Sequence, residues 1–171
     1  ELKYLELDNN QIETIAKGAF DGDAALDQFG LSGNFLETLP EGLFKDAGAS
    51  MTFLNISGNM FETLPSAISD AVKLKKLIAY NNVLTSIADV DFGKMADLTE
   101  INFMKNYIAE IKDGTFAKNS HLLSVDLHDN QLTNLSGSVF ADTFENSRED
   151  GKLQKLDITL NNIRVVDPAL M

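Results

Sequence analysis

The chain contains no cysteine and no tryptophan, and only 3 of its 171 residues are proline. Without cysteine it can form neither a disulfide framework nor a thiolate metal site. No segment approaches the run of about 18 apolar residues that a membrane-spanning helix needs, and no basic, apolar leader opens the sequence. We therefore expect no signal peptide and no direct membrane insertion in this segment.

Basic residues are also scarce, since 14 Lys and Arg stand against 26 Asp and Glu, for a formal net charge of -12. No basic stripe is present, so nucleic acid is not an expected partner. The two histidines are His121 and His128, and His128 stands near Asp126, Asp129 and Asp157. We interpret this group as a solvated acidic edge, with a weak divalent site as the alternative. The scattered glycines build no phosphate cradle, so we expect no cofactor, no resident metal and no catalysis.

What the sequence does contain is one motif repeated seven times. The copies begin at residues 2, 26, 51, 74, 98, 122 and 153, so their spacings are 24, 25, 23, 24, 24 and 31 residues. A period in this range indicates a solenoid, in which each copy contacts only its neighbours. Residues 1–171 are therefore expected to form one domain. The long sixth step places its extra residues within 141–152, which we interpret as a surface loop that binds a partner or as a tolerated insertion.

Each copy begins with apolar residues at its first, fourth and sixth places, and the last two alternate with polar residues, which is the period of a strand with one buried face. Three places further on, every copy has an asparagine: Asn10, Asn34, Asn59, Asn82, Asn106, Asn130 and Asn161. A buried amide can satisfy backbone groups where the chain leaves a strand. We predict a structural ladder of these side chains, and we expect the neighbouring Asn81 to tolerate alanine.

A phenylalanine recurs near the end of five of the first six copies, at Phe20, Phe44, Phe92, Phe116 and Phe140. The third copy is the shortest and has Ile68 one place early instead. A column of rings fills the volume behind a sheet that the strands alone cannot fill. These residues are therefore predicted to form a phenylalanine spine in the core.

These motifs resemble the leucine-rich repeat family over the whole chain. The typical 24-residue subclass is indicated by a glycine two places before phenylalanine and by two prolines: Gly18, Gly42, Gly114, Pro40 and Pro65. The resemblance implies an α/β repeat, a right-handed curved solenoid with a parallel sheet on its concave side. It also implies a protein-binding role similar to that of Toll-type receptor, Slit-type and invertebrate immune ectodomains, which act in innate immunity, adhesion or development.

Extracellular members of this family usually close both ends with disulfide-pinned caps, and such caps are absent here. We therefore expect the chain to be the middle of a longer extracellular or cell-surface protein. A cytoplasmic interaction scaffold also fits the missing cysteines, and a third reading makes the array the sensing region of a larger enzyme-linked protein. Two Asn-x-Ser sequons make Asn55 and Asn134 candidate glycosylation sites.

The outward-facing strand positions, which the repeat does not constrain, are polar at both ends of the array and apolar in its middle. The apolar ones in or just after the strands are Phe53, Ile78, Tyr80, Met104, Phe35, Met60, Val83 and Tyr107. Contiguous exposed apolar side chains usually mark an interface, so these residues are the predicted ligand-binding patch. The alternative is that they pack across strands and stabilise the sheet. The expected partner is a protein ligand or co-receptor, and both homo-oligomers and hetero-oligomers stay open.

Overall fold

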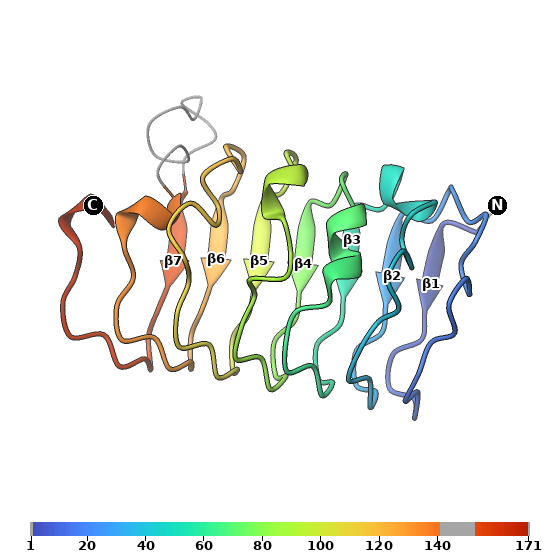
Figure 1. The fold of residues 1–171 in the computed structure, drawn as a ribbon, viewed down its shortest axis with the longest axis horizontal. Helices are drawn as coiled ribbons and strands as arrows, with labels where there is room; N and C mark the ends of the chain where they lie inside the picture. The colour runs from blue at the N-terminus through green and yellow to red at the C-terminus, as the bar shows by residue number, and fades with distance from the viewer. Residues whose placement is uncertain (1, 141–152, 171) are drawn as a thin grey trace.

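The computed structural model describes residues 2–140 and 153–170 of the chain, so the predicted loop at 141–152 lies outside the described residues. Seven short strands pair in chain order into a single parallel sheet: β1 (Tyr4–Glu6), β2 (Gln28–Gly30), β3 (Phe53–Asn55), β4 (Lys76–Ile78), β5 (Glu100–Asn102), β6 (Ser124–Asp126) and β7 (Lys155–Asp157). Figure 1 shows the strands side by side, with the two termini at opposite ends of the row. The predicted solenoid with a parallel sheet is confirmed.

The register of the sheet follows the sequence period. The central residues of the strands form one row of partners: Leu5, Phe29, Leu54, Leu77, Ile101, Val125 and Leu156. Side chains of a strand alternate between its two faces, so this row points into the core while its neighbours in sequence point outward. The outward side is called the sheet face below.

The side opposite the sheet carries only short 3-10 helices in the part of the chain that the structure describes. They are η1 (Ala47–Ala49), η2 (Ser66–Asp70), η3 (Phe92–Lys94), η4 (Gly137–Phe140) and η5 (Pro168–Leu170). The helical component of the predicted α/β repeat is thus limited to segments of three to five residues. The helical segments of three to five residues are short enough to adopt the tighter 3-10 form.

The core lies between the sheet and these helices. Phe44, Phe92, Phe116 and Phe140 are fully buried, and Phe20 in the first copy is half-buried. Ring centroids lie 4.9 Å apart for Phe92 and Phe116 and 5.6 Å apart for Phe116 and Phe140. The phenylalanine spine is therefore present. In the third copy the buried Ile68, on η2, lies in its place.

The ladder asparagines connect consecutive copies through hydrogen bonds. In the second copy, Asn34 Nδ2 donates to the carbonyl of Leu31 at 2.9 Å and to that of Leu7, one copy earlier, at 3.0 Å. Its Oδ1 accepts the backbone N–H of Ile12, also one copy earlier. The same three kinds of bond recur at Asn59, Asn82, Asn106, Asn130 and Asn161.

The first copy has no preceding copy to bind, and its asparagine behaves differently. Asn10 is exposed, and its amide nitrogen donates within its own copy to the carbonyls of Leu7 and Asp8. By contrast, the asparagines of copies two to six are buried, and Asn161 is half-buried. Burial of the amide thus depends on a neighbouring copy on each side.

The residue before each ladder asparagine has a left-handed backbone. Its φ lies between 51° and 64° at all seven positions: Asn9, Gly33, Gly58, Asn81, Lys105, Asp129 and Leu160. This region strains most L-residues and is tolerated by Gly, Asn and Asp, which hold five of the seven places. The expectation that Asn81 tolerates alanine is therefore corrected, because alanine would be strained there.

The two end copies are less buried than the middle. Leu5 in β1 and Leu156 in β7 are half-buried, whereas Leu54 and Leu77 in the middle of the sheet are fully buried. An end layer of a solenoid has a neighbour on one side only. Among the described residues, no helix is long and apolar enough to cross a membrane.

Candidate protein-binding surface

Large apolar side chains occupy one equivalent position in four consecutive copies. This is the position directly after the ladder asparagine, beyond the carboxyl ends of the strands, and it holds Phe35, Met60, Val83 and Tyr107 in copies two to five. Their exposed fractions lie between 40% and 51%. The flanking copies hold polar residues there: Gln11, Gln131 and Asn162. We call the four exposed residues the apolar row.

The backbone of the apolar row is fixed by the preceding copy. The N–H groups of Phe35 and Met60 each donate to a carbonyl one copy earlier at 2.9 Å, that of Val83 at 3.2 Å and that of Tyr107 at 2.8 Å. Each of these residues also follows a ladder asparagine that is itself bonded to the preceding copy. The side chains are therefore presented on a rigid frame, so little conformational entropy of the backbone is lost when a partner binds.

The remaining residues of the predicted patch differ in exposure. Tyr80, beyond the end of β4, is 37% exposed, whereas Phe53, Ile78 and Met104 are half-buried. Phe53 pairs in register with Lys76 on the next strand. Neighbouring strands lie about 4.8 Å apart, so side chains in the same register cover one another. The expectation that all eight patch residues are well exposed does not hold for these three.

The two sequons lie in different surroundings. Asn55 is half-buried on the sheet face, and its Oδ1 accepts the backbone N–H of Ser57 at 3.1 Å and the Ser57 hydroxyl at 2.6 Å. Asn134 is exposed in the segment between β6 and η4. Glycosylation at either site stays a prediction.

The predicted acidic edge is a set of hydrogen-bonded surface groups. Asp126 and Asp157 pair in register on β6 and β7, and His128 Nδ1 lies 2.5 Å from Thr159 Oγ1. The Thr159 hydroxyl, and then its N–H, hold the pKa of the Asp157 carboxyl below its ordinary value. Within residues 2–140 and 153–170 no group of three or more His, Asp or Glu has the geometry to hold a metal ion.

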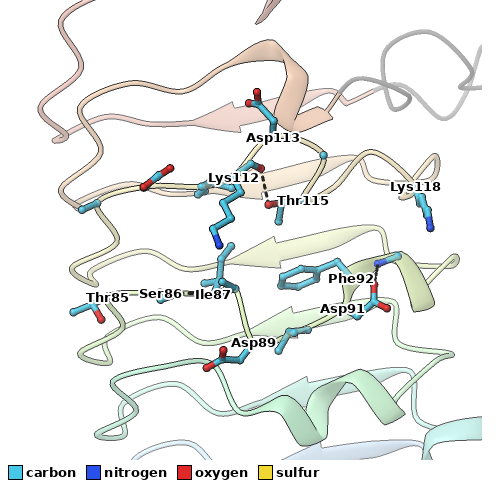
Figure 2. Close-up of a pocket in the computed structure, with 17 residues that line it drawn as sticks. Thr85, Ser86, Ile87, Asp89, Asp91, Phe92, Lys112, Asp113, Thr115 and Lys118 are labelled. Atoms are coloured by element: carbon cyan, nitrogen blue, oxygen red, sulfur yellow. Dashed lines mark hydrogen bonds between the residues drawn. The ribbon is translucent and has the colours of Figure 1, made fainter.

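A groove of about 690 Å³ lies on the flank of the fourth and fifth copies, between the turns at 85–93 and 109–118. Figure 2 shows Asp89 projecting from the first turn and Lys112 and Asp113 from the second. This groove is lined by residues of both charges. It is the main alternative to the apolar row as a contact surface.

Some polar groups of this flank groove hold local turns. Asp91 Oδ1 accepts the N–H of Gly93 at 3.1 Å, and the Thr115 hydroxyl donates to the carbonyl of Lys112 at 2.6 Å. Both bonds are visible in Figure 2. These contacts hold the turns themselves.

Two family models match the chain. Residues 96–143 match a leucine rich repeat model, and residues 1–75 match a BspA type leucine rich repeat region. The chain belongs to the leucine-rich repeat family. Domains of this family generally serve as protein–protein interaction modules. No curated protein sequence matches the chain significantly.

Solved structures share the fold at low sequence identity. A leucine-rich repeat protein of Leptospira interrogans gives a TM-score of 0.84 at 21% identity, over 98% of this chain and 40% of that one. TLR13, in a complex with ssRNA13, gives 0.81 at 24% identity, over 95% and 22%. The Toll–Spatzle complex of Drosophila gives 0.73 at 21% identity, over 90% and 21%. The chain thus spans less than half the length of these proteins, and the similarity shows a shared fold.

Proposed function

We propose that the chain is the recognition segment of a secreted or cell-surface protein, and that it binds a protein ligand or co-receptor through the apolar row and Tyr80. The observation that supports this most is the apolar row itself: four consecutive copies expose a large apolar side chain where the repeat requires none. Exposed contiguous apolar surface of this kind usually marks an interface. Catalysis forms no part of the proposed role.

Charge favours a protein over a nucleic acid as the partner. TLR13 has been solved with an RNA, but the present chain carries a net charge of -12, which repels a polyanion. Aromatic residues and methionine are enriched in protein interfaces, and the apolar row consists of Phe35, Met60, Val83 and Tyr107. A second copy of the chain is one protein that could fill this role.

An extracellular location is supported by the resemblance to receptor ectodomains and by the two sequons. The alternative is a cytoplasmic scaffold. The two readings differ in one observable, because an N-linked glycan is added only to a protein that enters the secretory route. The exposed Asn134 is the better acceptor on accessibility. Mass spectrometry of the natural protein should find a glycan there, and an unmodified Asn134 and Asn55 would favour the cytoplasmic reading.

The binding role is tested with matched tyrosine variants. Tyr107 lies in the apolar row, and Tyr4, 59% exposed on β1, lies at the polar end of the sheet. Immobilised wild type, Tyr107→Ser and Tyr4→Ser are incubated with proteins from the same source and compared band by band. A partner retained by wild type and Tyr4→Ser but lost by Tyr107→Ser supports the proposal. A partner retained equally by all three would place the binding surface elsewhere.

A further inference from the structure

Negative charge is concentrated in the first three copies. Residues 2–73, which form these copies, contain 11 acidic residues and 4 basic ones, so they carry a formal charge of -7 out of the net -12. Two of the four basic residues are already paired: Lys45 lies 3.1 Å from a carboxylate oxygen of Asp21, and Lys73 lies 3.2 Å from one of Asp97 in the fourth copy. These copies therefore have few cations to balance their carboxylates.

Three of these carboxylates stand beside the apolar row. Copies one to three each have a glutamate at the same position: Glu13, Glu37 and Glu62. This position lies two residues after the position that the apolar row occupies, and one inward-facing apolar residue stands between them. All three are exposed, and within the described residues their carboxylates form no hydrogen bond or ion pair. Residues two apart in an extended segment point to the same side, so Glu37 is presented beside Phe35 and Glu62 beside Met60.

One surface groove is lined both by these glutamates and by residues of the apolar row. It has a volume of about 550 Å³ and is lined by Glu13, Thr14, Phe35, Glu37, Thr38 and Met60. Two unpaired carboxylates and two large apolar side chains thus face one hollow. Carboxylates in consecutive copies repel each other, and a cation placed between them would relieve that repulsion.

We propose that the partner presents lysine or arginine next to apolar side chains, as a basic amphipathic protein segment. Its apolar groups contact Phe35 and Met60, and its cationic groups contact Glu13, Glu37 and Glu62. Lys and Arg suit this arrangement because their aliphatic stems pack on apolar surface while their charged ends reach carboxylates. This inference rests on the proposed function, since it names the chemistry of the partner that the apolar row binds.

Electrostatic complementarity of this kind acts mainly on association rate and salt dependence. The probe is a synthetic helix-forming peptide of about 20 residues made of leucine and lysine in an amphipathic pattern, long enough to be helical when bound. A version with glutamate in place of lysine is the peptide control. Binding is measured by fluorescence anisotropy at about 50 mM and about 200 mM salt, a range over which exposed charges become screened.

The decisive comparison uses two triple variants with the same change in net charge. We call Glu13, Glu37 and Glu62 the acidic row. The first triple variant carries Glu13→Gln, Glu37→Gln and Glu62→Gln, and so removes the three carboxylates of this row. The control triple variant carries Glu110→Gln, Asp113→Asn and Asp129→Asn, and removes three exposed carboxylates from the fifth and sixth copies instead. We expect the first triple variant to weaken lysine-peptide binding about tenfold and to reduce its salt dependence, and the second to change it less than about threefold. Equal effects of the two triples, or no effect of the first, would overturn the inference.

The variant Phe35→Ser separates this inference from the proposed function. If Phe35→Ser abolishes binding of a natural partner while the acidic-row triple leaves it unchanged, the apolar row binds but its partner is not basic. If the acidic-row triple weakens the natural partner and Phe35→Ser does not, the acidic row binds and the proposed role of the apolar row fails. Loss in both variants, with melting temperatures unchanged, supports both.

Discussion

The amide oxygen of Asn82 accepts the backbone N–H of Phe61, one copy earlier, at 3.3 Å. The amide nitrogen of the same side chain donates to the carbonyls of Ile56 and Ala79, both at 3.1 Å. One buried side chain therefore satisfies backbone groups in two copies at once. This contact fixes the turn that presents the next residue, Val83, on the apolar row.

Replacing Asn82 by alanine should destabilise the protein strongly. Each backbone group left unsatisfied in the interior costs about 1 to 3 kcal/mol, and Asn82→Ala removes the side-chain partner of several. Chemical denaturation measures the loss. The control is Asn81→Gly, because glycine keeps the left-handed backbone at that position and should be nearly neutral. Equal stabilities for Asn82→Ala and Asn81→Gly would contradict the role of the ladder.

Replacing Lys105 by asparagine should stabilise the protein. Lys105 has a φ of 54°, where most L-residues are strained by about 1 kcal/mol and asparagine is tolerated. We expect a gain in the free energy of unfolding of about 0.5 to 1 kcal/mol for Lys105→Asn. Lys112→Asn, at an exposed lysine without a positive φ, controls for the loss of charge. No difference between the two variants would show that the strain is not released.

A methyl group at Gly48 should be poorly tolerated. Gly48 lies in η1, and a Cβ atom there would overlap the backbone carbonyl of Asp70 in the next copy. Backbone atoms cannot move aside as a flexible side chain can, so Gly48→Ala should cost about 1 to 3 kcal/mol. Ala49→Ser adds one atom at the adjacent exposed residue and should be nearly neutral. Thermal melting compares the two, and a Gly48→Ala variant as stable as wild type would refute this packing.

The Asp157 carboxyl should titrate abnormally low. The Thr159 hydroxyl and then the Thr159 N–H lower its pKa. A pKa lowered in the folded state adds stability above the unfolded-state pKa, and this is lost as the pH falls through the folded-state pKa. Asp157 is half-buried on the last strand, where solvent still screens the interaction, so the effect on global stability is small. NMR titration of the side-chain carboxyl should show the pKa of Asp157 rising in Thr159→Ala, and an unchanged value would exclude this cause.

The inward-facing residues were predictable from the sequence because the equivalent residue of every copy occupies the same place in the core. Leu54 and Asn82, for example, have equivalents in all copies, and one copy suffices to assign the others. Exposure on the sheet face was less predictable. Phe53 is half-buried beside the strand that carries Lys76, a residue of the next copy whose identity the repeat does not determine.

The left-handed residues and the acidic row are hard to predict from the sequence for a different reason. The signal for the first was present, since Gly, Asn or Asp precedes most ladder asparagines. For the second, the sequence places Glu13, Glu37 and Glu62 at one repeat position but does not show which side chains they face. Their relation to Phe35 and Met60 became visible only in the groove that they line together. A linear pattern does not reveal which side chains converge across copies.

The central claim, that the apolar row binds a partner, is tested most directly by two valines of equal exposure. Val83 belongs to the row and is 40% exposed, and Val72 lies outside it and is 39% exposed. Neither side chain is in the core, so Val83→Ser and Val72→Ser should both keep the wild-type melting temperature. Leu84→Ala, at a fully buried residue, should lose about 2 to 5 kcal/mol of stability and serves as the structural contrast.

Affinity for the partner captured by wild type is then measured for both valine variants. We predict that Val83→Ser raises the Kd about tenfold, equivalent to about 1.4 kcal/mol, and that Val72→Ser leaves it within about twofold. Equal Kd values for the two variants, or a weaker affinity for Val72→Ser than for Val83→Ser, would contradict the claim that this row is the binding surface.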